Sequence, residues 1–435
     1  MISDIISVKD LFRQNPILEK INLNLCVKCK GTQLLCGLSR CPLIQSIDIN
    51  LRVKERIDTI SKDNSIFGPS PQVFLGSSGY PNIYSGPMTS LFPDNSNLST
   101  NPSDWVKLSI EEIIELRFGL LRGMKKANIY FQRDQHSTTI KEKLEELARS
   151  TNPVEIEGAL IRRPSFDVSL NAETQPMGPS GMLSNFSLTS NPKIPNKVDS
   201  VLSDELLSSE QMNILYNNGF DIYYLQNIFS TGGTGLTKSA KMVPTRWSIT
   251  ATDDIIGKEL ITQLYDFTQI QDITVFQGNL LGNYFTACLF PGNWQFENFE
   301  TWLPGGIFTL SETKFNMSVD REGFQVKEYY KGRSSYAKQA GGYYASRLGL
   351  LEYLHKIKKQ AKIVIFREIT SEYTVPVGVW CVREGVRKTM NSAPIKFLNK
   401  EELKPWLNDN LRVPSNLYFQ KSELFSQSSL MDFFK

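Results

Sequence analysis

The sequence predicts an α+β protein of mixed α/β character, in which helices and strands alternate unevenly along 435 residues. Segments rich in β-branched and aromatic residues predict strands, among them DITVFQ, YFTACLF, FQVKEYY and AKIVIFREI. Other segments repeat apolar residues at helical spacing, as in LSIEEIIELRFGLLRG. With 40% hydrophobic and 21% charged residues, the chain has the composition of a folded protein.

The predicted elements follow one another from the N-terminus. Helical patterns cover residues 43 to 66, 108 to 123, 138 to 150, part of 209 to 230, the segment KELITQLYDFTQ and residues 341 to 360. A short strand at Val73 to Leu75 precedes a loop rich in Gly and Pro, and residues 90 to 104 form a polar connection.

These elements predict four regions. They are an N-terminal region over residues 1–60 with a zinc knuckle at 26–41, a main α/β body over 61–295, a C-terminal α/β part over 296–415, and a flexible tail over 416–435. The tail ends in a motif at 427–434 that is described below.

The charge pattern limits the partners. A net charge of +3 gives no global basic field, so DNA would have to be met by a local patch. No uncharged apolar run approaches the ~20 residues of a membrane span, and the first residues lack the pattern of a signal peptide. We therefore expect a cytoplasmic protein without a membrane partner, which is associated with the nucleoid when it is on DNA.

Four of the six cysteines are clustered near the N-terminus as Cys26-x2-Cys29-x6-Cys36-x4-Cys41. A C-x2-C turn supplies two thiolates to a tetrahedral zinc ion, and a second pair completes the site. Disulfides are disfavoured in a cytosolic chain. The spacing therefore predicts a structural Zn²⁺ site with no open coordination position.

Two glycine-rich loops are candidates for phosphate binding. Gly76 and Gly79 lie in G-S-S-G-Y-P after a predicted strand, and Gly232 and Gly233 lie in G-G-T-G. Backbone N–H groups in such loops can hold a phosphate. Neither loop matches a nucleotide-binding fingerprint, and the loop from Gly232 to Gly235 is equally well interpreted as a mobile turn.

The segment V-P-T-R-W-S-I-T-A-T-D-D combines an anion donor with an aromatic surface and two carboxylates. Arg246 and Trp247 suit phosphate pairing and base stacking, and Asp253 with Asp254 suits a divalent metal. The alternative is a strand with a core Trp, followed by Asp residues that cap a helix beginning near Ile255. Both interpretations stay open.

The last nine residues, QSSLMDFFK, place apolar residues at the end of the chain. On one turn of tight helix, Leu430, Phe433 and Phe434 project together, with Gln427 upstream to hydrogen-bond at the rim. This spacing resembles the PCNA-interacting peptide (PIP), Q-x-x-(I/L/M)-x-x-(F/Y)-(F/Y). The alternative is a terminal helix packed on the protein's own core.

The cysteine knuckle, GSSGYPNIYSGPM, PMGPSG, VPTRWSITATDD and the terminal motif together resemble the archaeal Nre family of DNA repair proteins. The resemblance runs from the cysteines to the tail. It implies a role in the response to DNA damage, a C4-type zinc finger at Cys26, Cys29, Cys36 and Cys41, and recruitment by PCNA. It supplies no settled reaction.

The expected function is therefore a DNA repair protein that PCNA recruits and that carries a structural zinc, with DNA as a further partner. The alternative is an enzyme acting on DNA or a nucleotide, which uses the Arg246, Asp253 and Asp254 region as a metal-dependent nuclease or an NAD-type transferase. Mg²⁺, Mn²⁺ and NAD are its candidate cofactors. With only two histidines, the chain offers little for a Ser-His-Asp or His-metal hydrolase. Whether the chain is an enzyme is left open.

Overall fold

The computed structural model describes residues 64–92, 101–164, 177–304, 315–325, 328 and 332–426. Within them the chain forms two compact units. Unit 1 holds the described residues up to Ile256 together with Val375–Gly378, and unit 2 holds those from Gly257 onward apart from that segment. The boundaries predicted at residues 60, 295 and 415 stay predictions, because a division into compact units does not test where domains begin and end.

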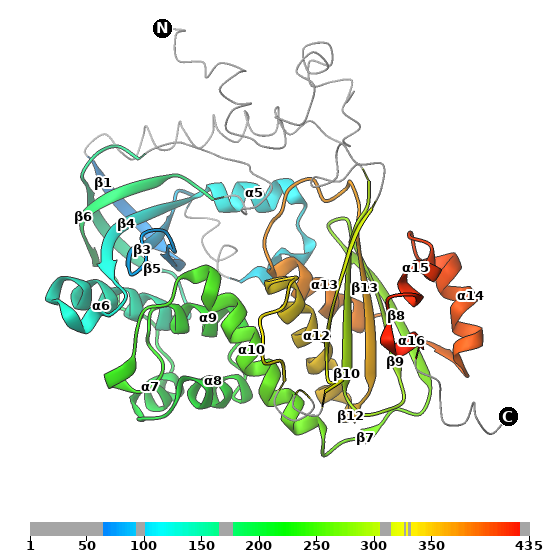
Figure 1. Cartoon of the computed structure of the whole chain (residues 1–435). Coiled ribbons are helices and arrows are strands. Elements are labelled where there is room, and N and C mark those ends of the chain that lie inside the picture. The colour runs from blue at the N-terminus through cyan, green and yellow to red at the C-terminus, as the bar shows by residue number, and fades with distance from the viewer. Residues whose placement is uncertain are drawn as a thin grey trace, which may run out of the picture. The chain divides into compact units, whose positions relative to one another are not determined.

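Unit 1 is built on a six-stranded sheet with the order β1-β5-β6-β4-β3-β2 (Figure 1). Its β4 and β6 are parallel and its other neighbours are antiparallel. The strands are β1 (Ser65–Ser70), β2 (Gln72–Leu75), β3 (Asn82–Ser90), β4 (Leu120–Asn128), β5 (Val154–Leu160) and β6 (Ser180–Leu188).

Helices of unit 1 begin where the sequence supplies capping side chains. Ser109 and Glu112 form a capping box on α5, and Asp134 and Asp221 accept backbone N–H groups at the starts of α6 and α9. The helices are α5 (Ile110–Phe118), α6 (Gln135–Arg149), α7 (Asn196–Ser203), α8 (Ser208–Asn217) and α9 (Ile222–Ser230). The next helix, α10 (Thr245–Leu264), crosses the division between the units.

Unit 2 is built on a second six-stranded sheet with the order β11-β10-β13-β9-β8-β14. Here β10 and β13 are parallel and the other neighbours are antiparallel. The strands are β8 (Ile273–Leu280), β9 (Asn283–Phe290), β10 (Gln295–Trp302), β11 (Asn316–Glu322), β13 (Lys362–Ile369) and β14 (Ile395–Phe397). Two short strands, β7 (Thr268–Gln269) and β12 (Lys359–Gln360), form a separate pair.

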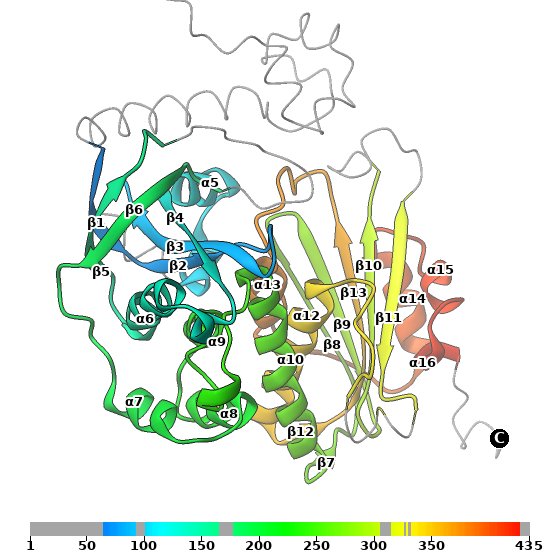
Figure 2. The same cartoon turned by 60° about the vertical axis from the view of Figure 1, so that its left-hand side comes forward.

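Helices cover both faces of this sheet, which makes three layers (Figure 2). The central strand β13 is buried from Ile363 to Ile369, as a strand covered on both faces must be. On one face lie α12 (Gly341–Ile357) and α13 (Trp380–Met390), and on the other lie α14 (Lys400–Asn410), α15 (Ser415–Phe419) and α16 (Glu423–Ser426). The core against α14–α16 includes Cys288, Phe299, Val364, Phe366, Leu407, Tyr418 and Phe425.

The predicted fold class is confirmed, because helices and mixed sheets make up the described chain. The predicted strand FQVKEYY is wrong where it is described: residues 324 and 325 form a bend and Glu328 is helical. The predicted helix over 43–66 lies outside the described residues except at its end, where Ser65 and Ile66 begin β1. In the described part of the chain, no helix combines the length and apolar character needed to cross a membrane.

Candidate nucleic-acid interface

The segment VPTRWSITATDD enters α10 instead of forming a strand. The N–H groups of Trp247 and Ser248 both donate to the Pro244 carbonyl, at 2.8 and 3.0 Å, and close the first helical turn. The strand interpretation is therefore wrong, and Asp253 and Asp254 lie inside the helix, away from its N-terminus, where a capping residue would be. Trp, Ile and Thr residues favour strands by propensity, but tertiary contacts override such weak preferences.

Three segments that are distant in sequence meet at the start of α10. The Ile129 N–H donates to Pro81 O and the Met242 N–H donates to Ile129 O, each at 3.0 Å. The Leu75 N–H, at the end of β2, donates to Thr245 Oγ1 at 3.0 Å. The β2–β3 loop, residues 129–133 and residues 240–247 are therefore held side by side within unit 1.

Aromatic side chains from these segments gather on the surface. The rings of Tyr80 and Trp247 lie 5.3 Å apart, tilted by 55°, and the two residues remain 46% and 45% exposed. The guanidinium carbon of Arg133 lies 4.4 Å from the centre of the Tyr130 ring. A hydrogen bond with Tyr130 raises the pKa of Tyr80 above its ordinary value.

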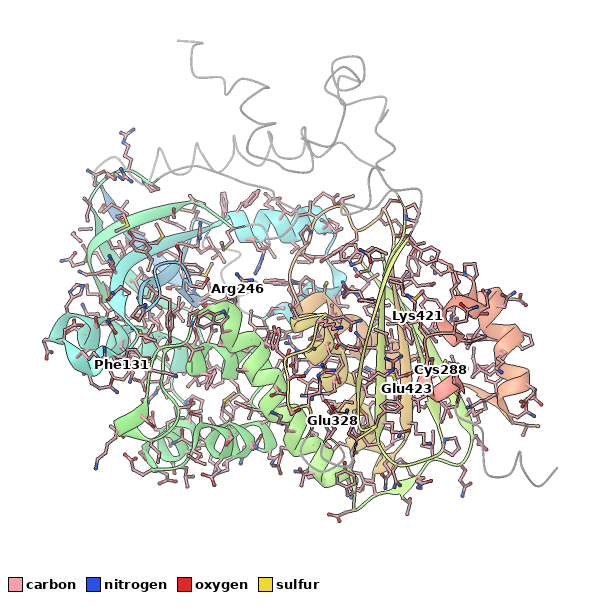
Figure 3. The ribbon with its side chains drawn as sticks, viewed as in Figure 1. Phe131, Arg246, Cys288, Glu328, Lys421 and Glu423 are labelled. Atoms are coloured by element: carbon pink, nitrogen blue, oxygen red, sulfur yellow. The ribbon has the colours of Figure 1, made fainter. Side chains whose placement is uncertain are left out.

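Further cations lie on the segment that carries Trp247. Arg246 is exposed beside Trp247, at the start of α10 (Figure 3). Lys238 and Lys241 are exposed on the segment that leads into the helix, which Gln132 Nε2 holds by donating to Ala240 O at 2.8 Å. We call Tyr80, Tyr130, Arg133, Arg246 and Trp247 the aromatic–cation surface. Such a surface can pair with phosphates and stack on bases.

The two glycines of the β2–β3 loop position Tyr80. The Gly76 N–H donates to Tyr84 O at 2.8 Å and extends the strand pairing. Gly79 has φ +81°, and a Cβ there would lie 2.8 Å from Asn82 O. The turn therefore needs glycine at this position. This hairpin carries Tyr80 at its end.

Gly232 and Gly233 lie at the end of α9, against the backbone of the segment that leads into α10. Their N–H groups donate to Phe229 O and Ile228 O at 3.1 and 3.2 Å, which closes the end of α9. Gly232 has φ +74°, and a Cβ there would lie 2.7 Å from Lys241 O. These two N–H groups are thus engaged within the protein, and the loop lets the Lys241 backbone pass closely.

The carboxylates of α10 are placed differently from Arg246. Asp253 lies about two helical turns further on and is fully buried, and Asp254 is partly buried. The part of the chain that the structure describes contains no group of three or more His, Cys, Asp or Glu that could hold a metal ion. A role for Mg²⁺, Mn²⁺ or NAD stays a prediction.

The predicted zinc ligands Cys26, Cys29, Cys36 and Cys41 lie outside the described residues, and so does the predicted clamp motif with Gln427, Leu430, Phe433 and Phe434. Both stay predictions. Among the residues of the surface, Tyr80 could have been found from its place directly after Gly79. Tyr130 and Arg133 carry no local signal, since only the fold brings them to Trp247.

Comparison with protein families matches the N-terminal model of archaeal Nre to residues 35–309 and the C-terminal model of archaeal Nre to residues 328–433. The chain belongs to the archaeal Nre family. The two Nre models together span both units and the aromatic–cation surface. No solved structure matches this Nre chain.

Curated Nre relatives cover most of the chain. A protein named DNA repair protein NreA from Archaeoglobus fulgidus is 38% identical over 373 residues, which are 86% of this chain and 90% of the relative. The protein of the same name from Haloferax volcanii is 35% identical and aligns with 76% of this chain and 79% of its own length. DNA repair protein NreB from A. fulgidus is 30% identical, with 92% and 96% covered.

Proposed function

We propose that this Nre chain is a DNA repair protein that the PCNA sliding clamp recruits to DNA and that contacts DNA through the aromatic–cation surface. The observation that carries the proposal is the similarity to relatives named DNA repair proteins, which extends over most of their length. Sequence similarity over this much of the relatives' length supports a shared role.

The aromatic–cation surface supports the DNA contact. Arg246 and Arg133 are exposed, Arg246 next to the exposed Trp247 and Arg133 against the partly buried ring of Tyr130, and a guanidinium pairs with phosphate oxygens in a bidentate manner. Lys238 and Lys241 add positive charge on the segment that leads into α10. This local patch fits a chain whose net charge is only +3.

The terminal motif supports recruitment by the clamp. Gln427, Leu430, Phe433 and Phe434 fill the defining positions of a PCNA-interacting peptide. The motif directly follows α16, where Phe425 is buried against the sheet of unit 2. A short apolar plug next to an anchored helix suits a preformed cleft on a partner.

The N-terminal cysteines support a structural zinc. Four thiolates at this spacing complete a tetrahedral site, so the metal would organise its region and leave no position for a substrate. The described geometry favours binding over the alternative of an enzyme at Arg246, Asp253 and Asp254, because Asp253 is buried while Arg246 is exposed.

The test combines clamp binding with DNA binding by the full chain. We expect the double variant Phe433→Ala, Phe434→Ala to lose more than about 30-fold in affinity for an archaeal PCNA, as for hot-spot residues. Met431→Ala, between the anchor positions, is the matched control and should bind normally. Unchanged clamp binding by the double variant, or no DNA binding by the wild type, would contradict the proposal.

A further inference from the structure

The structure of DNA limits which bases the exposed rings of the aromatic–cation surface can stack on. In a duplex the faces of the bases are covered by their neighbours, so a protein ring can stack only on a base that has left the stack. Tyr80 and Trp247 each keep almost half of their surface exposed although they contact each other. Exposed large aromatic rings like these are suited to a flat apolar partner.

The surface is also held in place before any ligand arrives. Leu75 N–H donates to Thr245 Oγ1, and Ile129 links the β2–β3 loop to the segment before α10. The Tyr80 hydroxyl is hydrogen-bonded to Tyr130. Fixed rings lose little conformational entropy on binding, which favours a stacking partner over a surface that must reorganise.

Charge lies where a nucleotide would need it. Arg246 directly precedes Trp247 in the first turn of α10 and is exposed. A base stacked on Trp247 brings its own phosphates within reach of a neighbouring guanidinium. The carboxylate of Asp134, which follows Arg133 in the sequence, accepts the Ser137 N–H at 2.7 Å and caps α6. It keeps its negative charge, so it belongs to the charges that a DNA ligand would meet beside Arg133.

We propose that the aromatic–cation surface recognises an unpaired nucleotide in DNA, as found in a gap or a single-stranded end, and discriminates against intact duplex. The base stacks on Trp247 and Tyr80, and Arg246 pairs with an adjacent phosphate. This inference rests on the proposed function and narrows its substrate to DNA that contains unstacked bases.

The experiment measures affinity of the full chain for three DNAs of one sequence: a single strand, a duplex, and a duplex interrupted by a short gap. Fluorescence anisotropy at one fixed salt concentration gives the dissociation constants. The variants are Trp247→Ala, Trp247→Phe and Tyr80→Ala. The control is Phe67→Ala, since Phe67 is a 65% exposed aromatic on β1, outside the surface. Melting curves check that each variant is folded.

We expect gapped and single-stranded DNA to bind more tightly than duplex. Trp247→Ala should weaken binding to these two DNAs by about 5- to 150-fold, the range for one stacked base, and should weaken duplex binding by a much smaller factor. Trp247→Phe should restore most of the affinity, and Phe67→Ala should behave as the wild type. A 2-aminopurine base in the gap should lose fluorescence on binding of the wild type, because stacking quenches it.

Two results separate the inference from the function beneath it. If the wild type binds all three DNAs equally, or Trp247→Ala weakens all of them equally, the discrimination is wrong while DNA binding stands. If the wild type binds none of them, the proposed DNA contact fails together with the inference.

Discussion

At the scale of single residues, a buried carboxylate fixes the C-terminal segment of unit 2. Glu368 on β13 is 2% exposed and accepts the N–H groups of Arg412 and Val413 at 3.0 and 2.9 Å. The Tyr418 hydroxyl also donates to it, at 3.1 Å. Charge-assisted hydrogen bonds in a buried site are strong, and without the carboxylate the Arg412 and Val413 N–H groups would lose this acceptor, while the Tyr418 hydroxyl would keep Thr301 Oγ1 at 2.9 Å.

The first prediction concerns this carboxylate. Glu368→Gln should lower the free energy of unfolding of unit 2 by about 3 kcal/mol. The glutamine side chain keeps one acceptor oxygen, but its NH₂ group would face the backbone N–H groups that now donate to the carboxylate. Glu372→Gln is the matched control, since Glu372 is exposed and should change stability by less than about 0.5 kcal/mol. Chemical denaturation followed by fluorescence measures both, and equal effects would contradict the role of Glu368.

The cysteines give a second prediction at this scale. Burial raises the pKa of the Cys288 and Cys381 thiols, so these two should react slowly with a thiol reagent in the folded protein. If Cys26, Cys29, Cys36 and Cys41 bind zinc, they should react only after a chelator removes it. Thiol titration with and without chelator, alongside a zinc assay, measures this.

The control for the thiol titration is the double variant Cys288→Ala, Cys381→Ala. It should release the same number of reactive thiols as the wild type when the chelator is added. A fall in that number would place the reactive thiols in unit 2, and four fast-reacting thiols before the chelator would contradict the zinc site.

At the scale of elements, sequence patterns identify the strands that are rich in apolar residues. β8, β9 and β13 are dense in apolar and β-branched residues and were predicted, as was α12. β10 was missed, because QFENFETW reads as polar. Its Glu297 is fully buried and is paired with Arg321 at 2.8 Å, with Ser422 as a further partner. Only the fold supplies those partners.

The sequence indicates some residues of the aromatic–cation surface and does not indicate that they meet. Arg246, Trp247 and the β2–β3 glycines stand out locally as an anion donor, an aromatic ring and a turn. That they converge depends on three long-range hydrogen bonds around Ile129 and Thr245. No pattern along one chain encodes such a meeting, so the contribution of Tyr130 could not be predicted.

The third prediction concerns the element that supports the surface. Gly232→Ala should destabilise unit 1 by about 3 kcal/mol, because φ +74° is costly for alanine and its Cβ would approach Lys241 O to 2.7 Å. Gly219→Ala is the control: its φ is also positive, at +89°, but nothing lies within 4 Å of the added Cβ. It should cost about 1 kcal/mol.

Denaturant midpoints measure both glycine variants. The difference between them isolates the close approach of the Lys241 backbone, since both carry the same cost of a left-handed residue. Equal shifts would mean that the segment before α10 is not held against the Gly232 loop.

At the scale of the whole molecule, the proposed clamp binding and the proposed DNA contact belong to different parts of the chain. The predicted clamp motif directly follows α16 in the sequence, and α16 is held by the Glu423 N–H donating to Glu297 at 2.7 Å. The aromatic–cation surface belongs to unit 1. We therefore expect the two activities to be lost separately.

The fourth prediction tests this separation. Removing residues 427–435 should abolish clamp binding and leave the affinity for gapped DNA within about twofold, because no residue of the aromatic–cation surface is removed. Trp247→Ala should weaken binding to gapped DNA by about 5- to 150-fold and leave clamp binding within about twofold. Calorimetry with PCNA and anisotropy with DNA measure the two variants, and a joint loss in either would argue that the activities share one site.

The most direct test of the DNA contact is the salt dependence of DNA affinity for the wild type and Arg246→Ala, with the exposed Lys197→Ala on α7 as control. We expect wild-type affinity to fall steeply with salt. Arg246→Ala should weaken binding and reduce the slope of log affinity against log salt concentration by about 1, the value for one lost phosphate contact. Lys197→Ala should match the wild type. An Arg246→Ala variant with wild-type affinity and slope would contradict the claim that this surface binds DNA.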